Sequence, residues 1–170
     1  MIDYGHLERI EKQIEKICAA VAEVPDDEEV AVGVWYKNIY SYNGDGSVNS
    51  LIGCRGCILS AAYAHHLEIP TKTAGMAFEE EEETLFVLQS AFEVEALDEV
   101  EILVDRAIND FDTHFCDEDF ILGKRAKEFM ILSLREHTQS HINQVKNSPH
   151  EKIRRIITNV THKPKEPEAG

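Results

Sequence analysis

Residues 84–115, TLFVLQSAFEVEALDEVEILVDRAINDFDTHF, pass from one hydrophobic period to another with no loop signal between them. In the first half, apolar side chains alternate, as in a half-buried strand: Phe86, Leu88, Phe92 and Val94. In the second half, they recur every three or four residues, the spacing of one helix face: Leu97, Val100, Val104, Ile108, Phe111 and Phe115. We therefore expect a buried strand that leads directly into an amphipathic helix. Asp98 followed by Glu101 predicts a capping box at its start.

An amphipathic helix and a β-hairpin are expected before this stretch. Residues 7–24 carry an apolar stripe at helical spacing, which Pro25 ends: Leu7, Ile10, Ile14, Ile17, Val21 and Val24. Residues 30–42 are rich in β-branched and aromatic residues, and Asn43-Gly44-Asp45-Gly46 predicts a turn into a second strand at 47–52. Residues 57–67 predict a buried helix, and residues 71–78 another strand.

After Cys116 the pattern is helical. Residues 120–145 predict one long helix with an apolar face formed by Met130, Leu134, Thr138, Ile142 and Val145. Ser148-Pro149-His150-Glu151 predicts the start of a short last helix that is apolar on one side and basic on the other. The fold class predicted is α+β, a small antiparallel sheet packed by helices with a C-terminal helical extension. We expect an α+β domain over residues 1–116, the extension over 117–161 and a disordered tail over 162–170.

Composition narrows the class of protein. The chain has 170 residues, 43% of them hydrophobic, and lacks an apolar run of the roughly 20 residues that a membrane span needs. We therefore expect no membrane partner. Four cysteines without a secretory signal predict a protein of the reducing cytoplasm with free thiols.

The net charge of −15 is unevenly distributed. Residues 79–119 hold sixteen acidic residues against Arg106, whereas residues 124–165 hold ten basic residues against three glutamates. An acidic body repels phosphates, so direct nucleic-acid binding is not expected. A solvated surface, a basic protein partner or pairing between the two regions would each fit. The partner-binding residues predicted are Glu79, Glu80, Glu81, Glu82, Glu83, Asp98, Glu101 and Asp105.

Two local motifs suggest chemistry. Cys54 and Cys57 have the spacing of a redox pair or of half a zinc site, or are two buried thiols. His137 and His141 lie four residues apart, so one metal ion could bind both. Residues 134–145, LREHTQSHINQV, resemble the HxxxHxxQ helix of DinB-like metal proteins. That resemblance implies a zinc or nickel enzyme with Cys54, His65 or His66 as the third ligand. A solvated or core-edge histidine pair is the alternative.

The order of elements is similar to that of the class I type III secretion chaperones, and residues 83–115 are similar to their strand, acidic turn and helix. The resemblance implies a homodimer that holds a partner chain on exposed apolar patches. The favoured function is thus a non-enzymatic acidic binding protein: a chaperone, an adaptor or an inhibitor. The alternatives are the DinB-like enzyme and a DNA-mimicking inhibitor of a nucleic-acid-binding protein.

Overall fold

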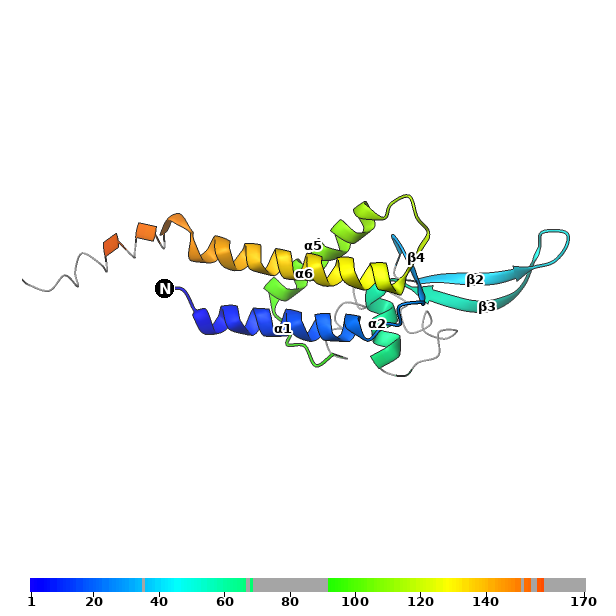
Figure 1. Ribbon diagram of the computed structural model, residues 1–170, viewed down its shortest axis with the longest axis horizontal. Coiled ribbons are helices and arrows are strands. Elements are labelled where there is room, and N and C mark those ends of the chain that lie inside the picture. The colour runs from blue at the N-terminus through cyan, green and yellow to red at the C-terminus, as the bar shows by residue number, and fades with distance from the viewer. Residues whose placement is uncertain (35, 67, 69–91, 151, 154–155, 158–170) are drawn as a thin grey trace, which may run out of the picture.

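The computed structural model describes residues 1–34, 36–66, 68, 92–150, 152–153 and 156–157 (Figure 1). Its helices are α1 (Tyr4–Ala22), α2 (Ile58–His66), α5 (Asp98–His114) and α6 (Gly123–Lys146). Its strands are β1 (Glu29–Ala31), β2 (Tyr36–Tyr42), β3 (Val48–Gly56) and β4 (Phe120–Leu122). Further helical residues occur at 149–150, 152–153 and 156–157. The predicted α+β class is confirmed, with two small antiparallel sheets, β1–β4 and β2–β3, among the described residues.

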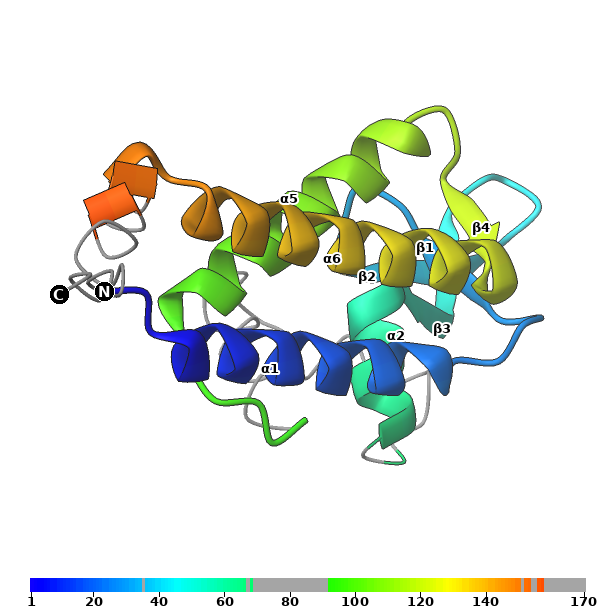
Figure 2. The same cartoon turned by 60° about the vertical axis from the view of Figure 1, so that its left-hand side comes forward.

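The helices α1 and α6 run side by side in opposite directions, and α5 crosses them (Figures 1 and 2). The predicted stripe explains α1, because all six of its residues lie in the main cluster of buried side chains. Asp3 caps this helix by accepting a hydrogen bond from the backbone N–H of His6 at 3.0 Å. The predicted face of α6 is confirmed too, with Met130, Leu134, Thr138 and Ile142 buried.

The start of α6 is tied to the loop that follows α1. The backbone N–H of Gly123 donates to the carbonyl of Glu28 at 2.6 Å, and that of Lys124 donates to the carbonyl of Asp26 at 3.0 Å. These bonds satisfy N–H groups that a helix start leaves unpaired. Next to them, β1 pairs with β4, and Val30 lies opposite Ile121. Residues on both sides of the domain boundary predicted after residue 116 therefore belong to one cluster of buried side chains, which α1, α5 and α6 share.

The strands β2 and β3 form a hairpin arm that projects beyond the helices (Figure 1). The predicted turn is confirmed: the N–H of Asn43 donates to the carbonyl of Ser47 at 2.8 Å, and the Asp45 carboxylate accepts from the Ser47 N–H at 2.9 Å. Gly46 has a positive φ of 85° there, which glycine adopts without strain. At the far end of the arm, Tyr42 and Val48 lie opposite each other with exposed fractions of 64% and 58%.

The entry to α5 differs from the prediction. Phe92 and Val94 are buried, as the alternation indicates, but residues 92–97 form a turn and an irregular connection rather than a strand. Glu93 has a φ of 55°, outside the extended region that strands require. The capping box is also wrong, because Leu97 is the N-cap residue and provides no side-chain capping bond. Its side chain packs against the core instead.

Two further boundaries are corrected, and some predictions lie outside the described residues. The strand expected over 30–42 is divided into β1 and β2, with bends at 32–34. The helix expected from residue 120 starts at Gly123, because residues 120–122 pair with β1 as β4. The strand at 71–78, the glutamates 79–83, the strand residues 84–91 and the tail at 162–170 lie outside the described residues.

Candidate protein-binding surface on helix α5

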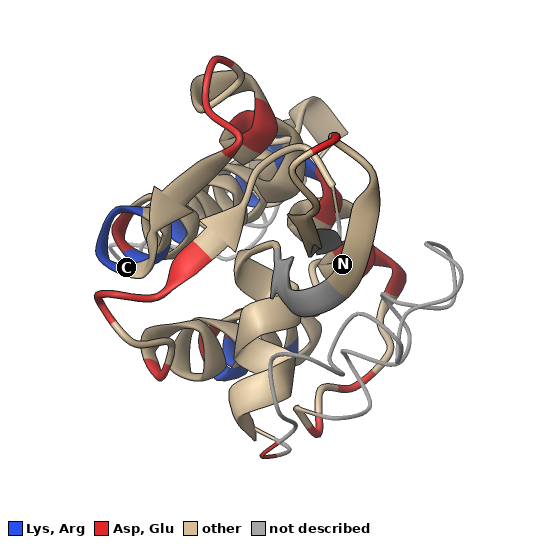
Figure 3. Ribbon diagram, turned by 90° about the vertical axis from the view of Figure 1, so that its right-hand side faces the viewer, with Lys and Arg blue, Asp and Glu red and all other residues tan. Residues whose placement is uncertain are grey.

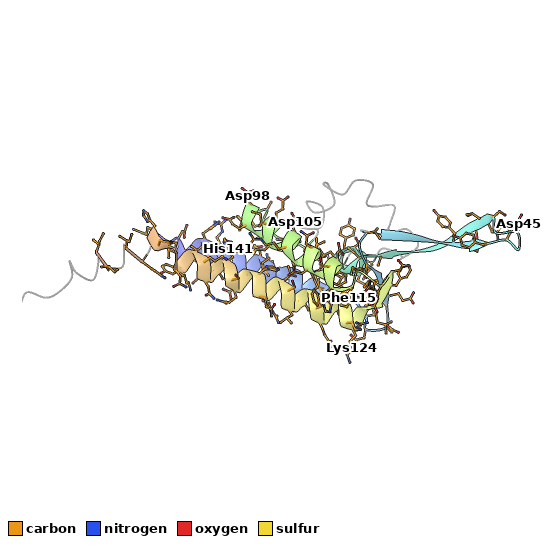
Figure 4. All side chains as sticks on the ribbon, turned by 90° about the horizontal axis from the view of Figure 1, so that it is seen from above. Asp45, Asp98, Asp105, Phe115, Lys124 and His141 are labelled. Atoms are coloured by element: carbon orange, nitrogen blue, oxygen red, sulfur yellow. The ribbon has the colours of Figure 1, made fainter. Side chains whose placement is uncertain are left out.

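Helix α5 has a buried face and an acidic face. Among its buried residues, Val100, Val104 and Phe111 belong to the predicted face, whereas Leu103 and Ala107 were not predicted. The predicted Ile108 is only half-buried. On the opposite side lie Asp98, Glu101, Ile102 and Asp105, all exposed, which we call the acidic face of α5. Figure 4 shows Asp98 and Asp105 pointing away from α1 and α6.

Aromatic contacts and one polar cluster fix the orientation of α5 against α6. The ring of Phe115 lies 4.9 Å from that of Phe111 and 5.3 Å from that of Phe129, measured between centroids. Asp110 accepts one hydrogen bond from the Ser133 hydroxyl at 3.3 Å and pairs with His137 at 2.5 Å. Because the aromatic cluster and the polar cluster both join α5 to α6, the orientation of α5 is fixed and its acidic face is directed outward.

Seven acidic side chains elsewhere in the described chain form ion pairs. The pairs are Glu15–Arg135, Asp26–Lys127, Glu28–His65, Glu95–Arg9, Glu99–His6, Asp110–His137 and Glu118–Arg125. Hydrogen bonding to Lys127 lowers the pKa of Asp26, and hydrogen bonding to His6 lowers that of Glu99. Arg125 joins the acidic and basic regions of the sequence, whereas Lys127 and Arg135 pair with residues near or on α1.

The acidic face of α5 is different. Within the part of the chain that the structure describes, no cation pairs with Asp98 or Glu101. Ile102 stands between them on the helix surface with 49% of its area exposed. Both acids lie in the first turn of α5, where the helix dipole favours negative charge. The face therefore combines two unneutralised carboxylates with an apolar side chain.

Sequence reasoning named the three acids of this face but missed Ile102. Position 102 falls outside the spacing of the buried residues, between the acids at 101 and 105. An isoleucine outside the buried stripe is the sequence signal that could have indicated an exposed apolar residue on this face. The predicted glutamates Glu79–Glu83 lie outside the described residues, so the structure does not place them relative to this face. Figure 3 shows acidic residues on the loops around the arm end of the molecule, whereas most basic residues lie on helices.

The two histidines of the predicted metal site have different surroundings. His137 pairs with Asp110, whereas His141 lines a hollow of about 340 Å³ with His6 and Glu99. The proposed third ligands have other neighbours: His65 pairs with Glu28, and the ring of His66 contacts that of Phe92. In residues 1–157, apart from the gaps given above, no group of three His, Cys, Asp or Glu side chains could hold a metal ion. Zinc or nickel binding stays a prediction.

The cysteine motif has one described thiol. Cys57 precedes α2, and its sulfur accepts a hydrogen bond from the backbone N–H of Ser60 at 3.5 Å. Its carbonyl accepts from the N–H of Ala61 at 2.8 Å. Burial raises the pKa of the Cys57 thiol, which favours the protonated and unreactive form. The side chain of Cys54 is not among those described, so the pairing of the two cysteines stays a prediction.

Across the described residues, no helix combines the length and the apolar character needed to cross a membrane. Comparison of the chain with protein families, curated proteins and solved structures returned no match.

Proposed function

We propose that this protein is a non-enzymatic binding module that holds a basic protein partner on the acidic face of α5. The observation that carries the proposal is that Asp98 and Glu101, which no cation pairs with in the described part of the chain, flank the exposed side chain of Ile102. Complementary charge steers association and selects the partner. A partner with lysine or arginine at the spacing of these acids would fit this face.

Ile102 supplies the apolar part of the proposed contact. Since 49% of its surface is exposed, covering it would contribute roughly 1 kcal/mol to binding. An apolar centre within a charged rim is the usual composition of a protein interface. The partner expected is therefore an amphipathic basic segment rather than a polyanion or a uniformly basic chain.

The end of the arm supports the same class of function. Tyr42 and Val48, opposite each other at the far end of β2 and β3, present an exposed apolar pair. A two-stranded hairpin has little stability of its own in water, so cover by a partner would stabilise this end. Exposed apolar patches are also what the resemblance to the class I type III secretion chaperones implies.

The test is a binding titration with a defined probe. A labelled amphipathic peptide of lysine and leucine, about 18 residues long so that it forms a helix, would be followed by fluorescence anisotropy. The variant Asp98→Asn, Glu101→Gln, Asp105→Asn should bind it about tenfold more weakly, since each exposed ion pair contributes roughly 0.5 kcal/mol. Added salt should also weaken binding of the peptide to the native chain, because it screens exposed charges.

A matched control separates the acidic face from net charge alone. Glu8, Glu11 and Glu23 are exposed acids on or next to α1, and changing all three to glutamine alters the net charge equally. This control should bind the peptide like the native chain. Equal weakening in both variants, or no binding of the peptide to the native chain, would contradict the proposal.

A further inference from the structure

The chain continues past α6 into a short segment whose described isoleucines are exposed. We call residues 148–157 the C-terminal segment, and its described residues, 148–150, 152–153 and 156–157, lie beyond the end of α6 in both ribbon views (Figures 1 and 2). The N–H of Lys152 donates to the carbonyl of Ser148 at 3.0 Å, which starts a helical turn as Pro149 predicts. The described residues 149–150, 152–153 and 156–157 are thus helical and lie outside the core.

The C-terminal segment is amphipathic. Ile153 and Ile156 are 58% and 63% exposed, and their spacing puts both on one side of a helix. Lys152 is exposed beside them, and the sequence adds Arg154 and Arg155, which lie outside the described residues. Exposed isoleucines in a stretch of basic sequence are poorly suited to water and well suited to an acidic surface with an apolar centre.

The acidic face of α5 has that composition. It offers the exposed carboxylates of Asp98 and Glu101 beside Ile102, which is 49% exposed. The isoleucines of the segment and Ile102 of the face are all exposed within one copy of the chain. Two surfaces that complement each other in charge and apolar character are therefore both uncovered in the single chain, and a second copy can cover each.

We propose that the C-terminal segment of one copy docks on the acidic face of α5 of a second copy, so that two chains exchange their segments in a symmetric dimer. A two-fold axis gives two identical contacts, which is the usual arrangement of homodimers. The inference rests on the proposed function in using the same face. A basic partner would then have to displace the segment, so self-association and partner binding compete.

The test is a charge exchange between two variants of the full chain, read by sedimentation velocity at about 0.2 mM protein and low salt. One variant carries Asp98→Lys, Glu101→Lys and Asp105→Lys, and the other carries Lys152→Glu, Arg154→Glu and Arg155→Glu. Each variant alone should sediment as a monomer, because both of its contacts would join like charges. Their equimolar mixture should form a dimer, because every contact then joins opposite charges.

Two further measurements keep the inference open to refutation if a variant folds poorly. The native chain should be dimeric at low salt and shift to monomer at about 0.5 M NaCl, where exposed charges are screened. A control variant with Glu8→Lys, Glu11→Lys and Glu23→Lys should dimerise on its own as the native chain does, because both of its contacts are unchanged. Circular dichroism would establish that all variants keep the native helix content.

A native chain that stays monomeric under all conditions would overturn the inference, including the case in which the segment folds back onto its own α5. A mixture of the charge-reversed variants that stays monomeric would overturn it as well. The peptide titration fails or succeeds independently: a monomer that binds the basic peptide would retain the proposed function and lose only the dimer. A dimer that does not bind the peptide would retain the inference of self-association and lose the proposed function.

Discussion

Arg135 on α6 and Glu15 on α1 form a two-bonded ion pair, with Nε–Oε1 and Nη2–Oε2 distances both of 2.9 Å. The pair joins two helices whose sequence positions are 120 residues apart. Hydrogen bonding to Arg135 lowers the pKa of Glu15 below its ordinary value. Both side chains are about half exposed, so solvent screens the pair.

A double-mutant cycle with Glu15→Gln and Arg135→Gln should give a coupling of about 0.5 kcal/mol in the free energy of unfolding at neutral pH. Because the folded pKa of Glu15 lies below the unfolded one, the coupling is fully present above its ordinary value of 4.5. It should be lost as the pH falls below that value and the carboxylate becomes protonated. Urea titrations at about pH 7 and pH 3 would measure it.

The pair Arg125–Glu118 is the matched control, because its N–O distance is 3.4 Å and its side chains are similarly exposed. Its coupling should be close to zero at either pH. A coupling at Glu118 as large as that at Glu15 would show that the two-bonded geometry has no special effect.

The second prediction concerns Gly123, where an added Cβ atom would lie 2.1 Å from the carbonyl oxygen of Pro25. Gly123→Ala must therefore displace backbone at the start of α6, which we expect to lower the free energy of unfolding by roughly 2 kcal/mol or more. The melting temperature should fall by about 5 °C. Gly44→Ala is the control, since a Cβ at Gly44 meets no atom within 4 Å. A tolerated alanine at 123 would mean that the loop after α1 moves freely.

Thiol labelling gives a third prediction. Burial raises the pKa of Cys18 to about 11, whereas Cys116 is exposed. Since the thiolate is the reactive form, Cys116 should be labelled about a hundredfold faster than Cys18 at pH 8. Mass spectrometry after timed labelling with iodoacetamide would assign each site. Equal rates in the native chain would contradict the burial of Cys18, and equal rates in denaturant are expected.

The elements that sequence predicts well are those whose own side chains determine them. The stripe of α1 and the turn 43–46 need only local periodicity and turn chemistry, and both are confirmed. Burial within α5 follows for the same reason. The acids of its outer face follow from the sequence too, once the buried side of the helix is known.

The features that sequence missed depend on distant partners. Residues 120–122 continue a helical pattern, and only β1, about ninety residues earlier in the chain, makes them a strand. His137 and His141 share a helix, but Asp110 and the hollow beside Glu99 separate their surroundings. The pairing of Glu15 or Asp26 with basic residues of α6, which leaves Asp98 and Glu101 unneutralised, is likewise a tertiary property.

Leu134 tests whether α6 belongs to the same folding unit as α1. Its side chain is fully buried in the cluster that α1, α5 and α6 share. Leu134→Ala should lower the free energy of unfolding by roughly 2–5 kcal/mol. In one cooperative unit, the variant must weaken the protection of amides in α1 and α6 by the same factor, because both helices exchange through the same global opening. Amide hydrogen exchange measured by mass spectrometry would compare the two helices. The exposed Leu132→Ala, on the same helix with 57% of its surface accessible, should leave both unchanged. Loss of protection confined to α6 would instead make residues 123–146 a separate extension of the domain, as the sequence pattern alone predicts.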